Sequence, residues 1–230
     1  MIDFIFLDID DTVFDFGYAE AEALREVLLP HGIVPTEVEI RLYSEINDSH
    51  WKRLERGELT RDEVRIGRFE VFFDRMGIAN VSARQTNELF MRAVTGYTCF
   101  HEGARELLDA LRARGKRLFV ASNATASVQY ERLRSAGIDG CFEAIFLSEE
   151  IGSQKPQREF FERCFASISN FDPSRAIILG DSLTSDILGG INAGIKTCWF
   201  NPKRKPCRED IVPDFEIASL LQFLDPSILN

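Results

Sequence analysis

Four groups of polar residues, each following an apolar run, contain the side chains of this 230-residue sequence that could do chemistry. They are Asp8-Ile9-Asp10-Asp11-Thr12, Ser122-Asn123, Lys155-Pro156 and Gly180-Asp181-Ser182-Leu183-Thr184-Ser185-Asp186. Carboxylates, a hydroxyl group and a lysine together suit phosphoryl transfer. A carboxylate can attack phosphorus, a hard cation such as Mg²⁺ reduces the repulsion between the anions, and fixed donors stabilise the transferred charge.

The spacing within the first group suits a division of roles. A second carboxylate two residues after a nucleophilic one can protonate the leaving oxygen and then deprotonate the hydrolytic water. General acid–base help of this kind contributes about 10²–10⁴-fold. Asp11 is interpreted as a residue that caps or braces the turn, with no catalytic role.

The elements that must position these groups follow from the hydrophobic pattern. Short apolar runs predict strands at 3–8, 117–121, 144–147, 176–180 and 196–200. Helical patterns lie between the later strands, at 102–114, 127–136, 156–167 and 182–193. This alternation predicts an α/β fold with a doubly wound parallel sheet and helices on both faces. Ligands bind at the carboxyl ends of such strands, so we expect the four groups to converge at one edge.

The stretch from about residue 18 to residue 97 interrupts the alternation. It shows no convincing strand pattern, and Gly32, Pro35, Gly57 and Gly77 divide it into roughly four helices. We expect a helical domain over 18–96, inserted into an α/β core formed by 1–17 and 97–230 and covering the carboxyl edge of the sheet. The tail at 202–213 is polar and basic, and a short last helix is expected to pack on the core.

The composition excludes several classes of function. The net charge is −10 with no basic block, which argues against binding to nucleic acid polymers or to an acidic membrane surface. The five cysteines contain no C-x-x-C pair and the three histidines lie far apart, so neither a disulfide framework nor a zinc site is expected. The apolar start is too short for a signal peptide or a membrane span, and the cytoplasm is the expected location.

The four groups, in this order, resemble the motifs of the haloacid dehalogenase superfamily, and the helical insertion resembles its cap domain. The resemblance covers the whole chain. It implies that Asp8 is the nucleophile and a Mg²⁺ ligand. It also implies that Asp10 is the acid/base and that its backbone carbonyl touches the metal.

The resemblance implies roles for the later motifs as well. Ser122, Asn123 and Lys155 are expected to hold the phosphoryl group. Asp181 is expected to complete the metal site, with Asp186 as a ligand or as a partner of one. In the insertion, the candidate substrate contacts are Phe16, Asn47, Trp51 and Arg68, for which structural roles are the alternative.

The reaction is narrowed further by Asp10, because the dehalogenases of this superfamily lack the second aspartate of the first motif. The stretches 180–200 and 51–69 resemble pyrimidine 5′-nucleotidases that hydrolyse UMP, dUMP and dTMP. The expected function is therefore Mg²⁺-dependent hydrolysis of a small phosphate ester through an aspartyl-phosphate, by a monomer or homodimer. A sugar-phosphate phosphatase, such as one for N-acylneuraminate 9-phosphate, or a phosphomutase is the alternative.

A phosphoryl-accepting signalling module is the remaining alternative. Receiver domains also place an acidic cluster, a hydroxyl group and a lysine around Mg²⁺ on a parallel sheet. Their accepting aspartate lies on a later strand, and they are about half this length with no helical insertion.

Overall fold

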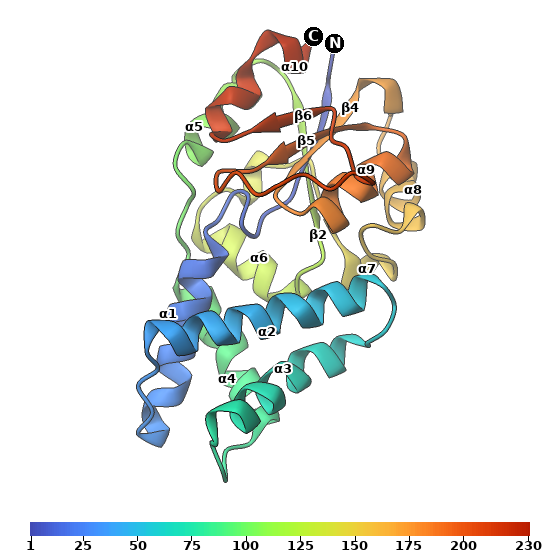
Figure 1. Ribbon diagram of the computed structural model, residues 1–230. Coiled ribbons are helices and arrows are strands. Elements are labelled where there is room, and N and C mark those ends of the chain that lie inside the picture. The colour runs from blue at the N-terminus through green and yellow to red at the C-terminus, as the bar shows by residue number, and fades with distance from the viewer. The chain divides into compact units, whose positions relative to one another are not determined.

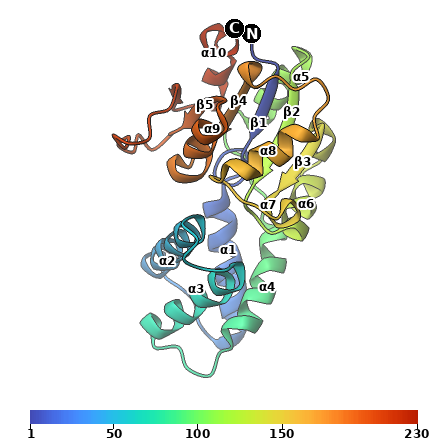
Figure 2. The ribbon, with the colours of Figure 1, turned by 90° about the vertical axis from the view of Figure 1, so that its right-hand side faces the viewer.

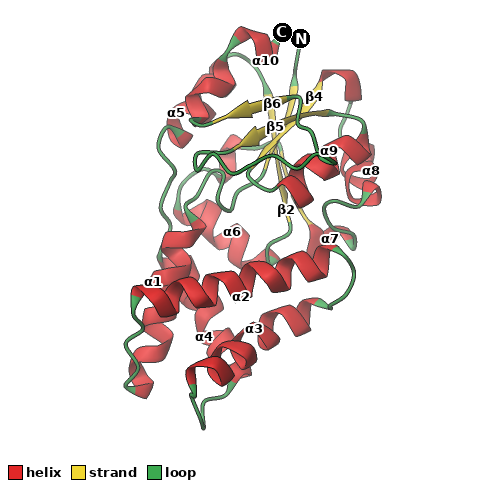
Figure 3. Ribbon diagram, viewed as in Figure 1, coloured by secondary structure: helices red, strands yellow, loops and turns green.

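The computed structural model describes residues 1–230, which form two compact units. The first unit contains Met1–Asp15 and Phe100–Asn230, and the second contains Phe16–Cys99. All strands belong to the first unit, whereas the second is helical (Figure 3). The assignment of the two units as catalytic core and cap stays a prediction. None of the helices is both long enough and apolar enough to cross a membrane.

A six-stranded parallel sheet forms the centre of the first unit (Figure 1). Its strands are β1 (Phe4–Leu7), β2 (Arg117–Ser122), β3 (Ala144–Leu147), β4 (Ala176–Gly180), β5 (Lys196–Phe200) and β6 (Phe215–Ile217). The spatial order is β3-β2-β1-β4-β5-β6, so β1 lies between β2 and β4. The predicted fold class, an α/β protein with a doubly wound parallel sheet, is confirmed.

The first unit also contains six α-helices, of which α5 to α9 lie between strands in the chain and α10 follows the last strand. They are α5 (Ala104–Ala113), α6 (Ala126–Ser135), α7 (Ser148–Ile151), α8 (Arg158–Ala166), α9 (Leu188–Ala193) and α10 (Pro226–Leu229). The N- and C-termini lie side by side, and the Ile2 N–H donates to the Leu229 carbonyl oxygen at 2.9 Å (Figure 1).

Both faces of the sheet are covered by helices. Successive residues of a strand point to opposite faces, so each strand contributes side chains to two separate cores. On β1, Ile5 and Leu7 belong to the core that contains residues of α5 and α10. Phe4 and Phe6 belong to the opposite core, which contains residues of α8. Figure 2 shows α8 lying across the strands. Strands buried on both faces need apolar residues at nearly every position, which explains the nearly continuous apolar runs in the sequence.

Strand β6, at the edge of the sheet beside β5, was not predicted from the sequence. This strand has only three residues, and its central Glu216 is exposed, so it gives no apolar run. Asp214 fixes the chain just before it, because its carboxylate accepts hydrogen bonds from the Thr197 N–H and hydroxyl at 2.8 Å each.

Four helices form the second unit: α1 (Phe16–Leu28), α2 (Glu37–Glu55), α3 (Arg61–Met76) and α4 (Ala83–Gly96). Capping boxes begin two of them, Thr36 with Glu39 at α2 and Thr60 with Glu63 at α3. Their shared core is aromatic. The Tyr43 ring lies 5.1 Å from the Phe69 ring and 5.4 Å from the Phe72 ring, measured between centroids.

Candidate active site

The carboxyl edge of the sheet brings together residues that are far apart in the sequence. Asp8 follows β1 and Asp181 follows β4, and these two strands are neighbours. The Asp8 N–H donates to the Leu179 carbonyl oxygen at 3.0 Å, which fixes the backbone where the strands end. The strand order reverses beside β1, because β2 and β4 lie on opposite sides of it. Ligand sites of open α/β sheets form at such a point.

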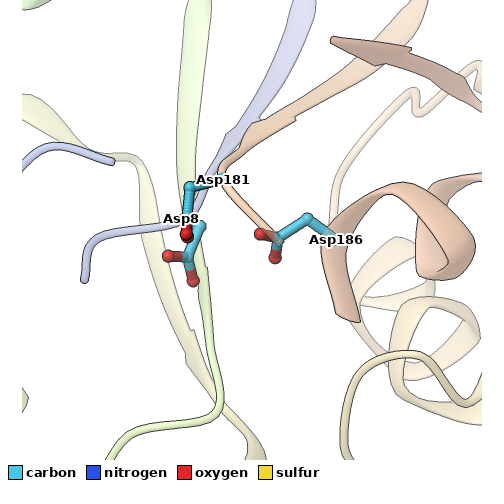
Figure 4. A group of neighbouring side chains, drawn as sticks. All are labelled: Asp8, Asp181 and Asp186. Atoms are coloured by element: carbon cyan, nitrogen blue, oxygen red, sulfur yellow. The ribbon is translucent and has the colours of Figure 1, made fainter. Parts of the chain in front are cut away.

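Three carboxylates meet at this edge. One oxygen from each of Asp8, Asp181 and Asp186 lies within 4.8 Å of the others. Figure 4 shows the Asp186 carboxylate, from the segment after β4, pointing toward the other two. Asp8 and Asp186 are buried, and Asp181 is half-buried. Carboxylates this close repel one another, so the cluster calls for cationic partners.

Lys155 is such a partner, and only 1% of this residue is exposed. Its ammonium group donates to Asp8 Oδ1, Asp186 Oδ1 and the Ala121 carbonyl oxygen, each at 2.6 Å. An ammonium group has three N–H donors, so these contacts use all of them. Lys155 therefore acts as the shared counter-ion of two of the three carboxylates.

Burial and mutual repulsion shift the ionisation of these groups. Burial, together with repulsion from the charges of Asp186 and Asp10, raises the pKa of Asp8 to about 8 against the opposing effect of Lys155. Burial also raises the pKa of Asp181 well above its usual range, with added repulsion from neighbouring carboxylates. Burial alone would lower the pKa of Lys155, but Asp186 and Asp8 outweigh it and the pKa is raised. Proton binding at this cluster is thus unusually favourable.

Asn123, the residue after β2, holds the backbone that carries Lys155. Its side-chain amide donates to the Lys155 carbonyl oxygen at 2.9 Å and accepts from the Lys155 N–H at 3.0 Å. This pair of bonds locates the loop before α8 against the sheet. The observed contact favours a positioning role for Asn123, whereas its predicted contact with phosphate stays a prediction.

The segment after β4 is shaped around the Asp186 carboxylate. Asp186 lies in a π-helical turn, Leu183–Ile187, and its Oδ2 accepts from the Ser182 N–H at 3.0 Å. A Cβ atom at Gly180 would collide with this carboxylate, so only glycine fits there. In the Gly-Asp-Ser sequence, Gly180 thus leaves the space that the Asp186 carboxylate occupies, and Ser182 provides the N–H that holds this carboxylate toward Lys155.

Comparison with known proteins identifies the family of this chain. The sequence model described as haloacid dehalogenase-like hydrolase matches residues 5–200. YfnB of Bacillus subtilis, named as a HAD-hydrolase, is 37% identical over 216 residues, which cover 94% of this chain and 91% of YfnB. The chain belongs to the haloacid dehalogenase-like hydrolase family.

Other relatives extend the comparison. The crystal structure of YfnB bound to magnesium superimposes with a TM-score of 0.93 at 36% identity, covering 100% of this chain and 99% of that one. The pyrimidine 5′-nucleotidase YjjG of Escherichia coli is 33% identical over 218 residues, 95% of this chain and 94% of YjjG. The pyrimidine 5′-nucleotidase PynA of Streptococcus pneumoniae is 34% identical over 231 residues, 99% of this chain and 97% of PynA. The resemblance seen in the sequence and the prediction of an enzyme are confirmed.

Two further residues predicted for the site of this hydrolase lie on the same edge. Ser122 is the last residue of β2; it is buried, and its hydroxyl oxygen accepts from the Ala124 N–H at 3.1 Å. Asp10 lies in the turn after β1 and forms an ion pair with Arg132. The roles assigned to them, phosphate contact for Ser122 and acid/base for Asp10, stay predictions.

The candidate substrate contacts of the helical unit have different surroundings. Asn47 and Arg68 are buried, and Arg68 Nη1 donates to Asn47 Oδ1 at 2.8 Å. Asn47 also donates to Glu20 at 2.7 Å, and Arg68 donates to Asn87 at 2.9 Å, so the network joins all four helices. These contacts favour structural roles for Asn47 and Arg68. Phe16, the first residue of α1, and the half-buried Trp51 on α2 stay candidates for substrate contact.

Arg132, the partner of Asp10, was missed by the sequence analysis. It lies on α6 and is 1% exposed. The available signal was its position on the helix, because it shares a buried face with Val128 and Leu133. A charged residue at an apolar position of an amphipathic helix indicates a specific buried partner.

Proposed function

We propose that this hydrolase is a Mg²⁺-dependent phosphatase of nucleoside 5′-monophosphates that forms an aspartyl-phosphate on Asp8. One observation carries the proposal. A buried lysine joins Asp8 to Asp186, and the carboxylate of Asp181 lies beside both. A nucleophilic carboxylate, a set of metal-binding carboxylates and a fixed cation are the groups that phosphoryl transfer to an aspartate requires.

The donor set fits Mg²⁺. Asp8, Asp181 and Asp186 offer only carboxylate oxygens, which are the ligands that this hard cation takes. Three carboxylates face one lysine, so a divalent cation would balance the remaining charge. When bound, Mg²⁺ would reduce the repulsion between Asp8 and the phosphate and stabilise the charge on the transferred group. The Asp10 backbone carbonyl is the further ligand that we propose.

The reaction then follows from the side chains in two displacements. A carboxylate oxygen of Asp8 attacks phosphorus while the ester P–O bond breaks, and Asp10 gives its proton to the leaving alcohol. A water molecule next attacks the phosphorus of the phosphoaspartate and gives a proton to Asp10. Phosphate leaves, and the Asp8 carboxylate is restored. Lys155 and the Ser122 hydroxyl would hold the phosphoryl oxygens during both steps.

The substrate class rests on the relatives. Two of them, YjjG and PynA, are named pyrimidine 5′-nucleotidases and match almost the whole of this chain. Extended matches of this kind include the helical unit as well as the α/β core. We therefore propose UMP, dUMP and dTMP as substrates, all of which are small phosphate esters.

A phosphate-release panel tests this substrate class. With Mg²⁺, we expect kcat/KM for UMP, dUMP and dTMP to exceed the values for purine nucleotides, sugar phosphates and N-acylneuraminate 9-phosphate. Preference for a sugar phosphate would reject the nucleotide assignment and keep the phosphatase. Transfer of phosphate within a sugar phosphate, with no free phosphate produced, would instead indicate a phosphomutase.

Magnesium binding to the metal-free enzyme is expected to release protons and to tighten as the pH rises toward about 8. The raised pKa values of Asp8 and Asp181 mean that protons occupy this cluster near neutral pH, and Mg²⁺ must displace them. Because these pKa values are raised in the folded state, the metal-free folded protein binds more protons than the unfolded chain. Its stability should therefore fall as the pH rises from about 4, where free aspartate ionises, toward about 8.

Isothermal titration in buffers of different ionisation enthalpy measures the released protons directly. The Asp8→Asn variant provides the control, because it removes one titrating group, and it should release fewer protons. A magnesium affinity that does not change between pH 6 and 8, with no proton release, would contradict the account of the cluster.

A further inference from the structure

A buried arginine holds the carboxylate of Asp10. Arg132 lies near the C-terminal end of α6 with 1% of its surface exposed, and its Nη1 donates to Asp10 Oδ1 in a direct ion pair. The Asp10 side chain is 26% exposed, so one side of it reaches solvent while the other faces the arginine. A charge-assisted contact of this kind restricts a carboxylate more strongly than a neutral hydrogen bond.

The arginine is itself fixed by its surroundings. Its guanidinium carbon lies 5.0 Å from the centre of the Phe14 ring, and Gln129 Oε1 accepts from Nη1 at 3.3 Å. Phe14 belongs to the same turn as Asp10, and its N–H donates to the Ile9 carbonyl oxygen at 2.8 Å. A planar guanidinium group beside an aromatic ring and a carboxylate has little freedom to move.

We propose that Arg132 is the positioning residue for Asp10: it fixes the orientation from which Asp10 transfers a proton to the leaving oxygen. This inference rests on the proposed role of Asp10 as acid/base. Because Nη1 donates to Oδ1, Oδ1 acts as an acceptor and Oδ2 is the oxygen that carries the transferable proton. In the first displacement the Oδ2–H proton passes to the leaving alcohol oxygen as its bond to phosphorus breaks and the Asp8–phosphorus bond forms.

A positioning role has a consequence that a purely structural role lacks. An alcohol such as the 5′-hydroxyl of uridine leaves poorly unless it is protonated, whereas p-nitrophenolate leaves readily as an anion. Misplacing Asp10 should therefore slow the release of uridine from UMP and have little effect on the release of p-nitrophenolate from its phosphate ester. Geometric misplacement by about 1 Å can lower a rate about 10²-fold.

The experiment is a single-turnover measurement of leaving-group release, which isolates the first displacement from hydrolysis of the phosphoenzyme. For Arg132→Gln we expect about a 10²-fold loss with UMP and less than about a threefold loss with p-nitrophenyl phosphate. The Arg132→Lys variant, which keeps the charge but loses the planar fork, should recover part of the rate with UMP. Asp10→Asn should show the same dependence on the leaving group, and the double variant should be no slower than Asp10→Asn.

Arg134→Gln provides the matched control on the same helix. Arg134 is 70% exposed and pairs with Glu131 one turn away, so its loss should leave both rates unchanged. Thermal melting of each variant distinguishes misfolding from a catalytic effect. If Arg132→Gln does not fold, the two rates are compared in Arg132→Lys instead.

The outcomes separate this inference from the proposed function. Equal losses with both substrates in Arg132→Gln, or effects of Arg132→Gln and Asp10→Asn that simply multiply, would overturn the positioning role. A loss confined to KM would indicate direct substrate binding and would overturn it as well. If Asp10→Asn itself shows no dependence on the leaving group, the assigned role of Asp10 fails instead.

Discussion

Replacing Asp8 with asparagine is expected to lower kcat by on the order of 10⁴-fold or more, since the variant lacks the nucleophile of the first displacement. The fold should survive the change. Asparagine has the same shape, and its Oδ1 can still accept the hydrogen bond that Lys155 donates to Asp8. Burial penalises the charge of Asp8, so the neutral amide removes an unfavourable term. Turnover with Mg²⁺ and melting temperature, measured on the same preparation, provide the test.

Asp11→Asn is the matched control for this substitution. Asp11 lies three residues away in the same turn, and its φ of 58° is a backbone conformation that asparagine tolerates. We assign it no catalytic role, so this variant should keep most of its activity. Substantial turnover by Asp8→Asn, or equal losses in both variants, would show that the nucleophile has been placed wrongly.

Replacing Lys155 with methionine is expected to destabilise the fold by about 3–5 kcal/mol, because removal of one partner leaves a buried charge uncompensated. Activity should fall as well. Lys155 is the cation that faces both Asp8 and Asp186. The loss of stability should be smaller at low pH, where protons neutralise the carboxylates, and smaller with saturating Mg²⁺, which supplies positive charge. Urea unfolding at two pH values, with and without Mg²⁺, measures the loss of stability and its dependence on pH and on Mg²⁺.

Lys52→Met provides the contrast. Lys52 donates to Asp48 at 2.6 Å, the same distance as the contacts of Lys155, but its side chain is 48% exposed. Ion pairs at the surface contribute about 0–1 kcal/mol, so this variant should remain close to wild-type stability. Similar losses in the two variants would mean that the buried lysine is not the counter-ion that its contacts indicate.

Much of the α/β core could be predicted from the sequence because its strands are buried on both faces. Continuous apolar runs and the glycines after the helices mark β1 to β5 within one or two residues of their observed ends. The edge strand β6 could not be found in this way, because an edge position needs few apolar residues. Its pairing with β5 depends on a long-range contact between Asp214 and Thr197, which no local pattern records.

The site was predictable to the extent that it depends on strand ends. Asp8, Asp181 and Asp186 meet because parallel strands end at a common edge, and this follows from the order of the elements. The contacts of Asn123 and Arg132 depend on how loops and helices pack on the sheet, so the sequence alone does not reveal them. In the helical unit, Asn47 and Arg68 have the residue types of a binding site, but packing places them in a buried network.

Chemical trapping of the intermediate tests the central claim most directly. Acid quenching during turnover of a pyrimidine nucleotide, followed by borohydride reduction, converts a phosphorylated aspartate to homoserine, and peptide mass spectrometry locates the converted residue. The account predicts homoserine at position 8, dependent on both substrate and Mg²⁺ and absent from Asp8→Asn. Conversion at another aspartate, or unmodified Asp8 in an enzyme that is releasing phosphate, would contradict it.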